Sequence, residues 1–302
     1  MAIKIVDTLE GEGGSKLERW WDRNGFQSIY KEFRKGQLDP ALLNKIKDIR
    51  NVQKAFRLKG YQFGNWVTNE DRYNYLAALG ICLYDLNKVL KFKGHNLGLD
   101  ETLGVAFGAR GQGRALAHFE SRTNIINVTR YKDADAFIDA PPKPVRFVYS
   151  GGVGAFAHEY GHFLDYFFGS RVEAHNTIYA LTDGRSTDKA KIVYDKGKYP
   201  MRYTTELIIE KAYWSPKKLD STYINRIKKA VPERYHEYFL RRNEIFARLF
   251  EQYVAYKLKE LDIKNNFLTQ TKYHSSQYMR PEEFAEVVPL FDQLIAQMRK
   301  HF

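Results

Sequence analysis

The spacing of apolar residues predicts that most of the chain is helical. In residues 69–92 the leucines fall three or four positions apart, which is the period of a helix with an apolar face; these are Leu76, Leu79, Leu83, Leu86 and Leu90. Periodicity and apolar content predict further helices over residues 15–36, 40–60, 153–168, 201–213, 216–230, 243–260 and 281–300.

Three short segments in the middle of the chain have the character of strands. Residues 103–109, 115–120 and 123–129 are rich in small, β-branched or aromatic residues, and glycine-rich or turn-like stretches separate them. The last two segments are predicted to form a hairpin. Residues 169–200 have no clear period and are predicted to be a loop. We therefore expect an α+β fold that is mostly helical and contains a small mixed or antiparallel sheet.

Charge and cysteine content narrow the class of protein. The 302 residues include 48 Lys and Arg against 36 Asp and Glu, a net charge of +12, and the single cysteine is Cys82. One cysteine cannot form an intramolecular disulfide, which suits a reducing cytoplasm. No signal peptide is recognised at the N-terminus, and no apolar run approaches the ~18 residues that a membrane span needs. The basic residues are scattered, so a generally basic surface is favoured over a nucleic-acid patch, and weak nucleic-acid association is left open.

The segment that carries chemistry is His158-Glu159-Tyr160-Gly161-His162. Two histidines four residues apart lie on one face of a helix, so both imidazoles can bind one Zn²⁺. Zinc lowers the pKa of a bound water to about 7, and Glu159 can accept the proton of that water as a general base. Two histidines and a carboxylate suit zinc better than Mg²⁺ or Ca²⁺. The segment therefore predicts metal-assisted hydrolysis of an amide.

A polar stripe on an otherwise apolar helix strengthens this interpretation. His158, Glu159, His162, Asp165 and Tyr166 fall on one side, whereas the rest of the helix is rich in phenylalanine. Asp165 either accepts a hydrogen bond from the second ring nitrogen of a ligand histidine or is an ordinary polar residue near the helix end.

The third zinc ligand is expected on the helix over residues 243–260. Glu244 and Glu251 share its narrow polar edge with Arg248. The two glutamates lie one heptad apart, about 10.5 Å along the helix, so both cannot reach one metal ion. Glu244 lies in the first turn, where the helix dipole favours a carboxylate, so we predict that Glu244 is the ligand. Glu251 is better placed to bind Arg248 or the outer nitrogen of a ligand histidine.

These segments resemble known metallopeptidases. His158 to Tyr166 is similar to the active-site helix of anthrax-lethal-factor-like metallopeptidases, and Glu244-Ile245-Phe246-Ala247 resembles their third-ligand helix. A closer resemblance, over about residues 60–300, is to the metallopeptidase-like domain of the large polyvalent proteins of phages and conjugative elements. The residues that carry it are Phe63-Gly64-Asn65-Trp66-Val67, Asp71-Arg72, Tyr75-Leu76, residues 103–111, Ala117-His118-Phe119-Glu120, Ile126-Asn127-Val128-Thr129, Phe246-Ala247-Arg248 and Phe250-Glu251.

The resemblance implies a zincin-like fold with its sheet packed on the active-site helix. It implies a metallopeptidase domain over residues 61–302, with two insertions at about 131–150 and 170–235. Residues 1–60 lie outside the resemblance, and their apolar period predicts a helical N-terminal extension. The resemblance also implies that Ala117, His118 and Phe119 belong to an edge strand that pairs with the substrate backbone. Tyr238 matches in placement the tyrosine that stabilises the oxyanion, although any of the 21 tyrosines could match by chance.

Together these observations predict a zinc metallopeptidase of the gluzincin type that acts on a protein or peptide in the bacterial cytoplasm or in a phage virion. One alternative is a phage virion, cargo or structural protein that binds zinc but cleaves nothing. A second is a basic DNA-associated protein with a structural zinc. The intact Glu159 disfavours the second alternative, because a structural zinc has four closed ligands and needs no adjacent base.

Overall fold

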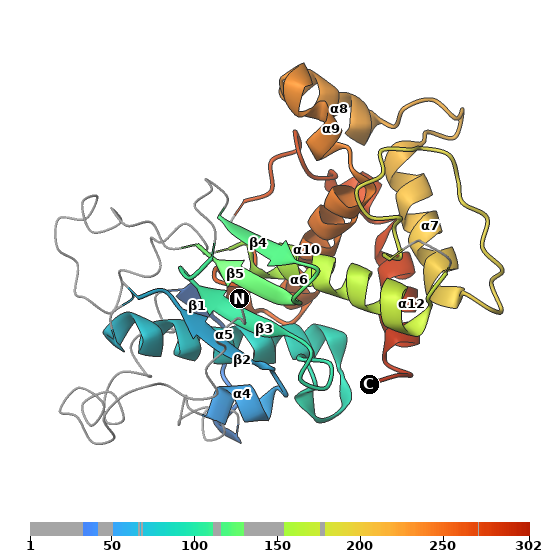
Figure 1. Ribbon diagram of the computed structural model, residues 1–302. Helices are drawn as coiled ribbons and strands as arrows, with labels where there is room; N and C mark the ends of the chain where they lie inside the picture. The colour runs from blue at the N-terminus through green and yellow to red at the C-terminus, as the bar shows by residue number, and fades with distance from the viewer. Residues whose placement is uncertain are drawn as a thin grey trace. The chain divides into compact units, whose positions relative to one another are not determined.

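The computed structural model divides the chain into two compact units. It describes residues 33–41, 51–65, 67, 69–110, 116–129, 154–175, 179–270 and 272–302 (Figure 1). The first unit is Met1–Glu159 with Ala255–Thr271, and the second is Tyr160–Val254 with Lys272–Phe302. The predicted helix at 15–36 lies largely outside the described residues, as do residues 42–50 of the helix predicted at 40–60. In the described part of the second prediction the helix ends at Ala55, and Gly60 begins a strand. The division at residue 60 stays a prediction.

A four-stranded mixed sheet forms the centre of the first unit. Its strands are β2 (Gly60–Phe63), β3 (Gly104–Phe107), β5 (Ile125–Val128) and β4 (Ala117–Glu120), in the order β2-β3-β5-β4. The first three are parallel, and β4 pairs antiparallel with β5 in the predicted hairpin. Every residue of β3 and β5 is buried, as in strands covered on both faces. Strand β2 was not predicted, and its first residue, Gly60, falls at the end of the helix predicted over residues 40–60.

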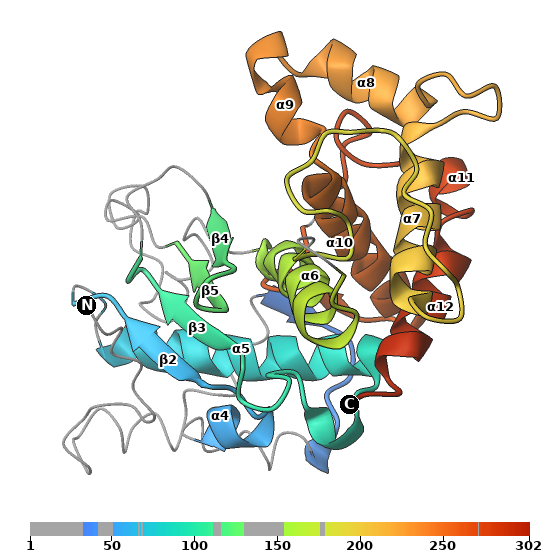
Figure 2. The ribbon, with the colours of Figure 1, turned by 45° about the vertical axis from the view of Figure 1, so that its right-hand side comes forward.

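Helix α5 (Asn69–Leu90) runs along this sheet (Figures 1 and 2). The Tyr75 ring of α5 stacks on the Phe107 ring of β3, with centroids 4.8 Å apart. The leucines that predicted α5 are buried. The position and length of α5 are therefore confirmed, and its apolar face belongs to the core of this unit.

A second, two-stranded sheet joins β1 (Arg34–Lys35) to β6 (Lys264–Asn265). The prediction of helix at Arg34 and Lys35 was wrong. The Arg34 guanidinium is buried against the Asp85 carboxylate of α5, at 2.7 and 2.9 Å, and the Asn265 side chain donates to the same carboxylate. Buried charges need such partners, and these partners are too distant in sequence for local periodicity to reveal.

The second unit is helical. Its helices are η6 (Phe168–Val172), α7 (Pro200–Tyr213), α8 (Thr222–Ala230), η7 (Glu233–Tyr235), α9 (His236–Phe239), α11 (Pro281–Phe284) and α12 (Val288–Met298). Helices α6 (Phe156–Phe167) and α10 (Arg242–Glu260) contribute residues to both units. The first unit also contains α4 (Val52–Ala55) and η3 (Lys93–His95). The unit boundaries pass through α6 and α10, which are continuous helices. Helix α8 begins at Thr222 rather than at residue 216, because the Ser221 hydroxyl caps it by accepting a hydrogen bond from the Ile224 N–H.

Aromatic side chains hold the helices of the second unit together. The Phe291 ring of α12 lies 5.1 Å from the Tyr253 ring and 5.6 Å from the Phe246 ring of α10. Helices α7 and α12 pack side by side (Figure 2), where the Thr204 hydroxyl accepts hydrogen bonds from Gln293 and Gln297. The predicted fold class is confirmed: the described chain is α+β, about half helical, with small sheets. The zincin-like arrangement of these parts stays a prediction.

Candidate metal centre

Helix α6 presents the two predicted ligand histidines. Phe156, Tyr160 and Phe163 are fully buried, so the apolar side of α6 is packed into the protein. His158 is half-buried and His162 is 7% exposed, and both lie on the remaining side. Because α6 is continuous from His158 to His162, helix geometry alone sets their mutual placement, with Cβ atoms about 5–6 Å apart. Glu159 lies between them in the first turn and is also 7% exposed.

Helix α10 brings Glu244 to His162. The His162 Nε2 and Glu244 Oε1 atoms lie 3.4 Å apart, and Glu244 is 7% exposed. Ligand atoms of His158, His162 and Glu244 all lie within 4.8 Å of one another. These are the three residues that the sequence selected as metal ligands.

The distance between His162 and Glu244 fits that of two ligands on one tetrahedral zinc ion. Two ligand atoms bound to Zn²⁺ at about 2.0–2.1 Å lie about 3.3–3.4 Å apart in a tetrahedron. The 3.4 Å between His162 and Glu244 matches this value and exceeds an ordinary N–H···O hydrogen bond. Two imidazoles and one carboxylate leave a fourth position open, as in catalytic rather than structural zinc sites.

A glycine and an alanine allow α6 and α10 to approach closely. A Cβ atom placed on Gly161 would lie 3.3 Å from the Ala247 Cα and 3.0 Å from the Phe250 Cδ1. Both small residues belong to the motifs that predicted the site, in which Gly161 precedes His162 and Ala247 follows Glu244 by three positions. Their size is what brings the two ligand-bearing helices within reach of each other.

We expect Gly161→Ala to weaken zinc binding by about 10-fold, the lower end of the effect of altering a ligand's support. The added methyl group pushes Ala247 and Phe250 away by a few tenths of an ångström and moves Glu244 with them. Zinc affinity measured by competition with a chelator checks this. Gly197→Ala is the matched control, because a Cβ at the exposed Gly197 approaches only an Asp195 side-chain oxygen, at 3.3 Å. Equal affinities for the two variants would contradict the role of the small residues.

Asp165 is fully buried and is hydrogen-bonded to Thr182. Its carboxylate accepts hydrogen bonds from the Thr182 N–H at 2.9 Å and the Thr182 hydroxyl at 2.7 Å. Burial raises the pKa of Asp165 to about 6, while the Thr182 hydrogen bonds and nearby His162 act in the opposite direction. Asp165 is thus close enough to influence His162 electrostatically, and a direct bond to a histidine ring stays a prediction.

Glu251 is hydrogen-bonded to two tyrosines, neither of which was among its predicted partners. Its carboxylate accepts hydrogen bonds from the Tyr278 hydroxyl at 2.9 Å and the Tyr273 hydroxyl at 3.1 Å. Burial raises the pKa of Tyr278 far above its usual range, and the charge of Glu251 adds to this effect. The geometry favours Glu244 over Glu251 as the third ligand, because only Glu244 joins both histidines in the cluster found among the described residues.

Tyr238 and Tyr166 are the two tyrosines considered for stabilising an oxyanion. Tyr238 is 45% exposed, and its ring lies edge-on to Phe239 and beneath the Arg241 guanidinium. Its predicted catalytic role stays a prediction. Tyr166 follows His162 by one turn of α6 and hydrogen-bonds to the Asn243 side chain. Burial is the main cause of its raised pKa, to which Glu244 contributes. Sequence reasoning gave Tyr166 no role.

The predicted substrate strand is an edge strand of the described sheet. Ala117, His118 and Phe119 belong to β4, which pairs with β5 on one side. The His118 Nε2 lies 3.5 Å from the Glu120 Oε1 on the same strand. This strand lies in the first unit, and its binding of a substrate stays a prediction.

Sequence comparison adds one finding about the C-terminal part of the chain. Residues 231–302 match the family model of large polyvalent protein-associated domain 1. The match includes the first turn of α10 with Glu244 and excludes α6 with its two histidines. It links the chain to the large polyvalent proteins, as the resemblance implied, while the metallopeptidase part of that resemblance stays a prediction. Searches of curated proteins and of solved structures find no match.

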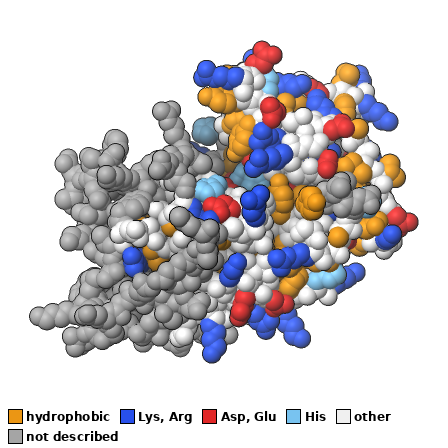
Figure 3. Space-filling model, viewed as in Figure 1, with side chains coloured by type: hydrophobic (Ala, Val, Ile, Leu, Met, Phe, Trp, Pro, Cys, Tyr) orange, Lys and Arg blue, Asp and Glu red, His pale blue; other side chains and the backbone are white. Residues whose placement is uncertain are grey.

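Basic side chains are scattered over the described surface. On the face drawn in Figure 3, lysines and arginines are spread among acidic side chains rather than gathered into one patch. Several are paired, for example Lys191 with Glu210 and Lys211 with Glu286, each at 2.7 Å. This distribution does not favour a dedicated nucleic-acid surface on that face. Among the described helices, none has the length and apolar character that crossing a membrane requires.

Proposed function

We propose that the chain is a zinc-dependent metallopeptidase. The observation that carries this proposal is the convergence of His158, His162 and Glu244, whose ligand atoms lie within 4.8 Å of one another, beside a helix-borne glutamate. Those three residues would hold the metal. Zinc bound there would supply a Lewis acid that polarises a carbonyl and lowers the pKa of water to about 7.

Glu159 is the residue of the chain that moves protons in this proposal. Its carboxylate accepts a proton from the attacking water and then donates it to the leaving amide nitrogen. It lies next to His158 in the sequence and is largely buried, so it is placed near the metal ligands and shielded from bulk solvent. Asp165 and Glu251 support the helices that carry the ligands, through Thr182 and through two tyrosines respectively.

A polypeptide is the substrate class that we propose, in the bacterial cytoplasm or in a phage virion. The match to large polyvalent protein-associated domain 1 supports this setting. The same match is compatible with a virion or cargo protein that binds zinc without cleaving a peptide. The metallopeptidase and the non-cleaving protein share the zinc site, and they differ in whether Glu159 takes part in cleaving a bound peptide.

We expect the purified protein to contain about one Zn²⁺ per chain, because the described donor set forms one three-ligand site. Elemental analysis of the protein, before and after incubation with zinc and dialysis, measures the stoichiometry. The His158→Ala/His162→Ala double variant is the control and should retain no stoichiometric zinc. Absence of a transition metal from the wild-type protein after incubation would refute the proposed function. Stoichiometric zinc without cleavage of a peptide library would favour the non-cleaving alternative.

A further inference from the structure

Residues 181–188, here called the bridging loop, contact both helices that carry the predicted ligands. On the α6 side, the Leu181 N–H donates to the Asp165 carbonyl at 3.1 Å, in addition to the two hydrogen bonds from Thr182 to the Asp165 carboxylate. Asp165 follows His162 by three positions in a continuous helix. The loop is therefore attached to α6 within one turn of a ligand histidine.

The same loop completes the beginning of α10. The first N–H groups of a helix have no partner within the helix, so other groups must accept their hydrogen bonds. Here the Ser186 carbonyl accepts from the Arg242 N–H at 2.9 Å, and the Gly184 carbonyl accepts from the Asn243 N–H at 3.0 Å. Glu244 is the next residue. Gly184 has φ +64°, a conformation that glycine adopts without strain, and its own N–H donates to the Thr182 hydroxyl.

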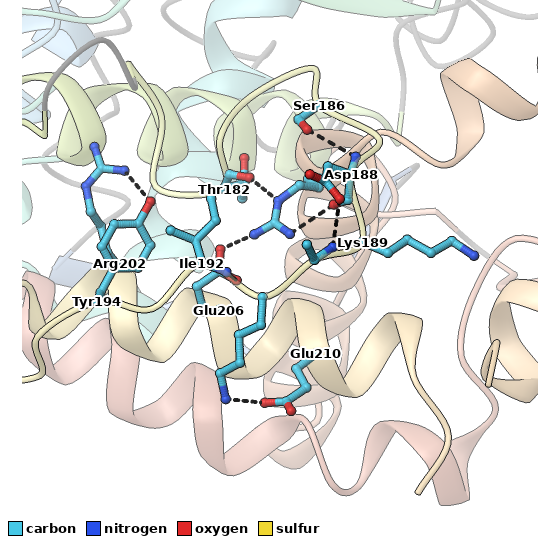
Figure 4. A network of polar contacts seen from close by, with 12 residues as sticks. Thr182, Ser186, Asp188, Lys189, Ile192, Tyr194, Arg202, Glu206 and Glu210 are labelled. Atoms are coloured by element: carbon cyan, nitrogen blue, oxygen red, sulfur yellow. Dashed lines mark hydrogen bonds and ion pairs between the residues drawn. The ribbon is translucent and has the colours of Figure 1, made fainter. Parts of the chain in front are cut away.

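The Arg242 side chain ties the loop to α10 and to α7. It is 1% exposed, and its guanidinium donates to the carbonyls of Thr182 and Asp188 and forms an ion pair with Glu206. Figure 4 shows that Thr182, Asp188 and Glu206, the three residues whose oxygens bind this guanidinium, lie close together. Glu206 also accepts a hydrogen bond from the Ile192 N–H. A planar guanidinium that meets acceptors in several directions fixes its own backbone position, which is two residues before Glu244.

We propose that the bridging loop sets the separation of His162 and Glu244. The positioning residues are Thr182 in the loop and Arg242 at the start of α10. This inference rests on the proposed zinc site. Thr182 contacts α6 through its N–H and hydroxyl and α10 through its carbonyl, so one residue spans both ligand helices. Because ligand atoms must lie within a few tenths of an ångström of their positions for tight binding, loosening this connection weakens the site.

The test compares variants that break the connection with one that removes a similar buried group elsewhere. Arg242→Lys and Thr182→Val are each expected to lower zinc affinity about 10–100-fold, measured by competition with a chelator. Thr182→Ser keeps the hydroxyl and should bind zinc with wild-type affinity. Arg34→Lys is the matched control: Arg34 is also a buried arginine paired with a buried carboxylate, but its partners Asp85, Gly36 and Gln37 lie outside the loop, α6 and α10. It should bind zinc about as tightly as the wild type.

Amide hydrogen exchange gives a readout that is independent of activity. If the loop and the metal site are coupled, zinc must slow exchange at Leu181, Thr182 and Gly184 in the wild type, and this protection should be reduced in Arg242→Lys but retained in Arg34→Lys. Wild-type affinity in both Arg242→Lys and Thr182→Val, in folded proteins, would overturn the inference and leave the zinc site standing. Failure of the wild type to bind zinc would instead remove the proposed function and this inference with it.

Discussion

Glu244→Ala is expected to lower zinc affinity by more than about 100-fold, because it removes a direct ligand and not merely the support of one. The Glu244 Oε1 lies 3.4 Å from the His162 Nε2, the separation of two ligands on one zinc ion. With only His158 and His162 left, the donor set falls below the three protein ligands that catalytic zinc sites use. Competition with a chelator, followed by elemental analysis of the dialysed protein, measures the loss.

Glu251→Gln is the matched control for this prediction. Glu251 lies two turns further along α10 and is fully buried, so the substitution removes a carboxylate charge from the same helix. The amide oxygen can still accept a hydrogen bond from one of the two tyrosines, and the amide NH2 can donate to the hydroxyl oxygen of the other, so the fold should persist. The expected loss of zinc affinity is no more than about 10–100-fold. A greater loss for Glu251→Gln than for Glu244→Ala would move the third ligand to Glu251.

Glu159→Gln is expected to keep the zinc and the fold while lowering peptide hydrolysis by about 10²–10⁴-fold. Glutamine has nearly the same shape as glutamate but cannot accept the proton of the attacking water. Glu159 is absent from the three-ligand cluster, so zinc content should not change. Cleavage of a peptide library by the zinc-loaded variant and wild type, with zinc measured in the same samples, checks both parts.

Two control variants show whether the loss of hydrolysis in Glu159→Gln is specific to that residue. Glu251→Gln makes the same chemical change at another buried glutamate and should retain most of the activity, which separates a local catalytic loss from a general effect of removing charge. His162→Ala should lose zinc and activity together. Equal cleavage by Glu159→Gln and wild type would show that Glu159 is not the base.

Local patterns in the sequence were sufficient for most helices and for the choice of metal ligands. Long apolar periods mark α5, α7 and α10, because each buries one face over three or more turns. His158 and His162 share a face by helix geometry alone, and the position of Glu244 in the first turn of its helix follows from where the apolar period begins. These features depend on neighbours within one or two turns, which a single sequence displays.

The tertiary structure alone decided which distant groups complete the site. Thr182 and Arg242 are 60 residues apart, and Thr182 lies in a segment without any period that was predicted only as a loop. The conversion of Arg34 and Lys35 from expected helix to strand likewise depends on Asp85 and Asn265. A buried charge or an uncapped helix end must find a partner, but its sequence does not say which one, because the partner is chosen by the packing of the whole unit.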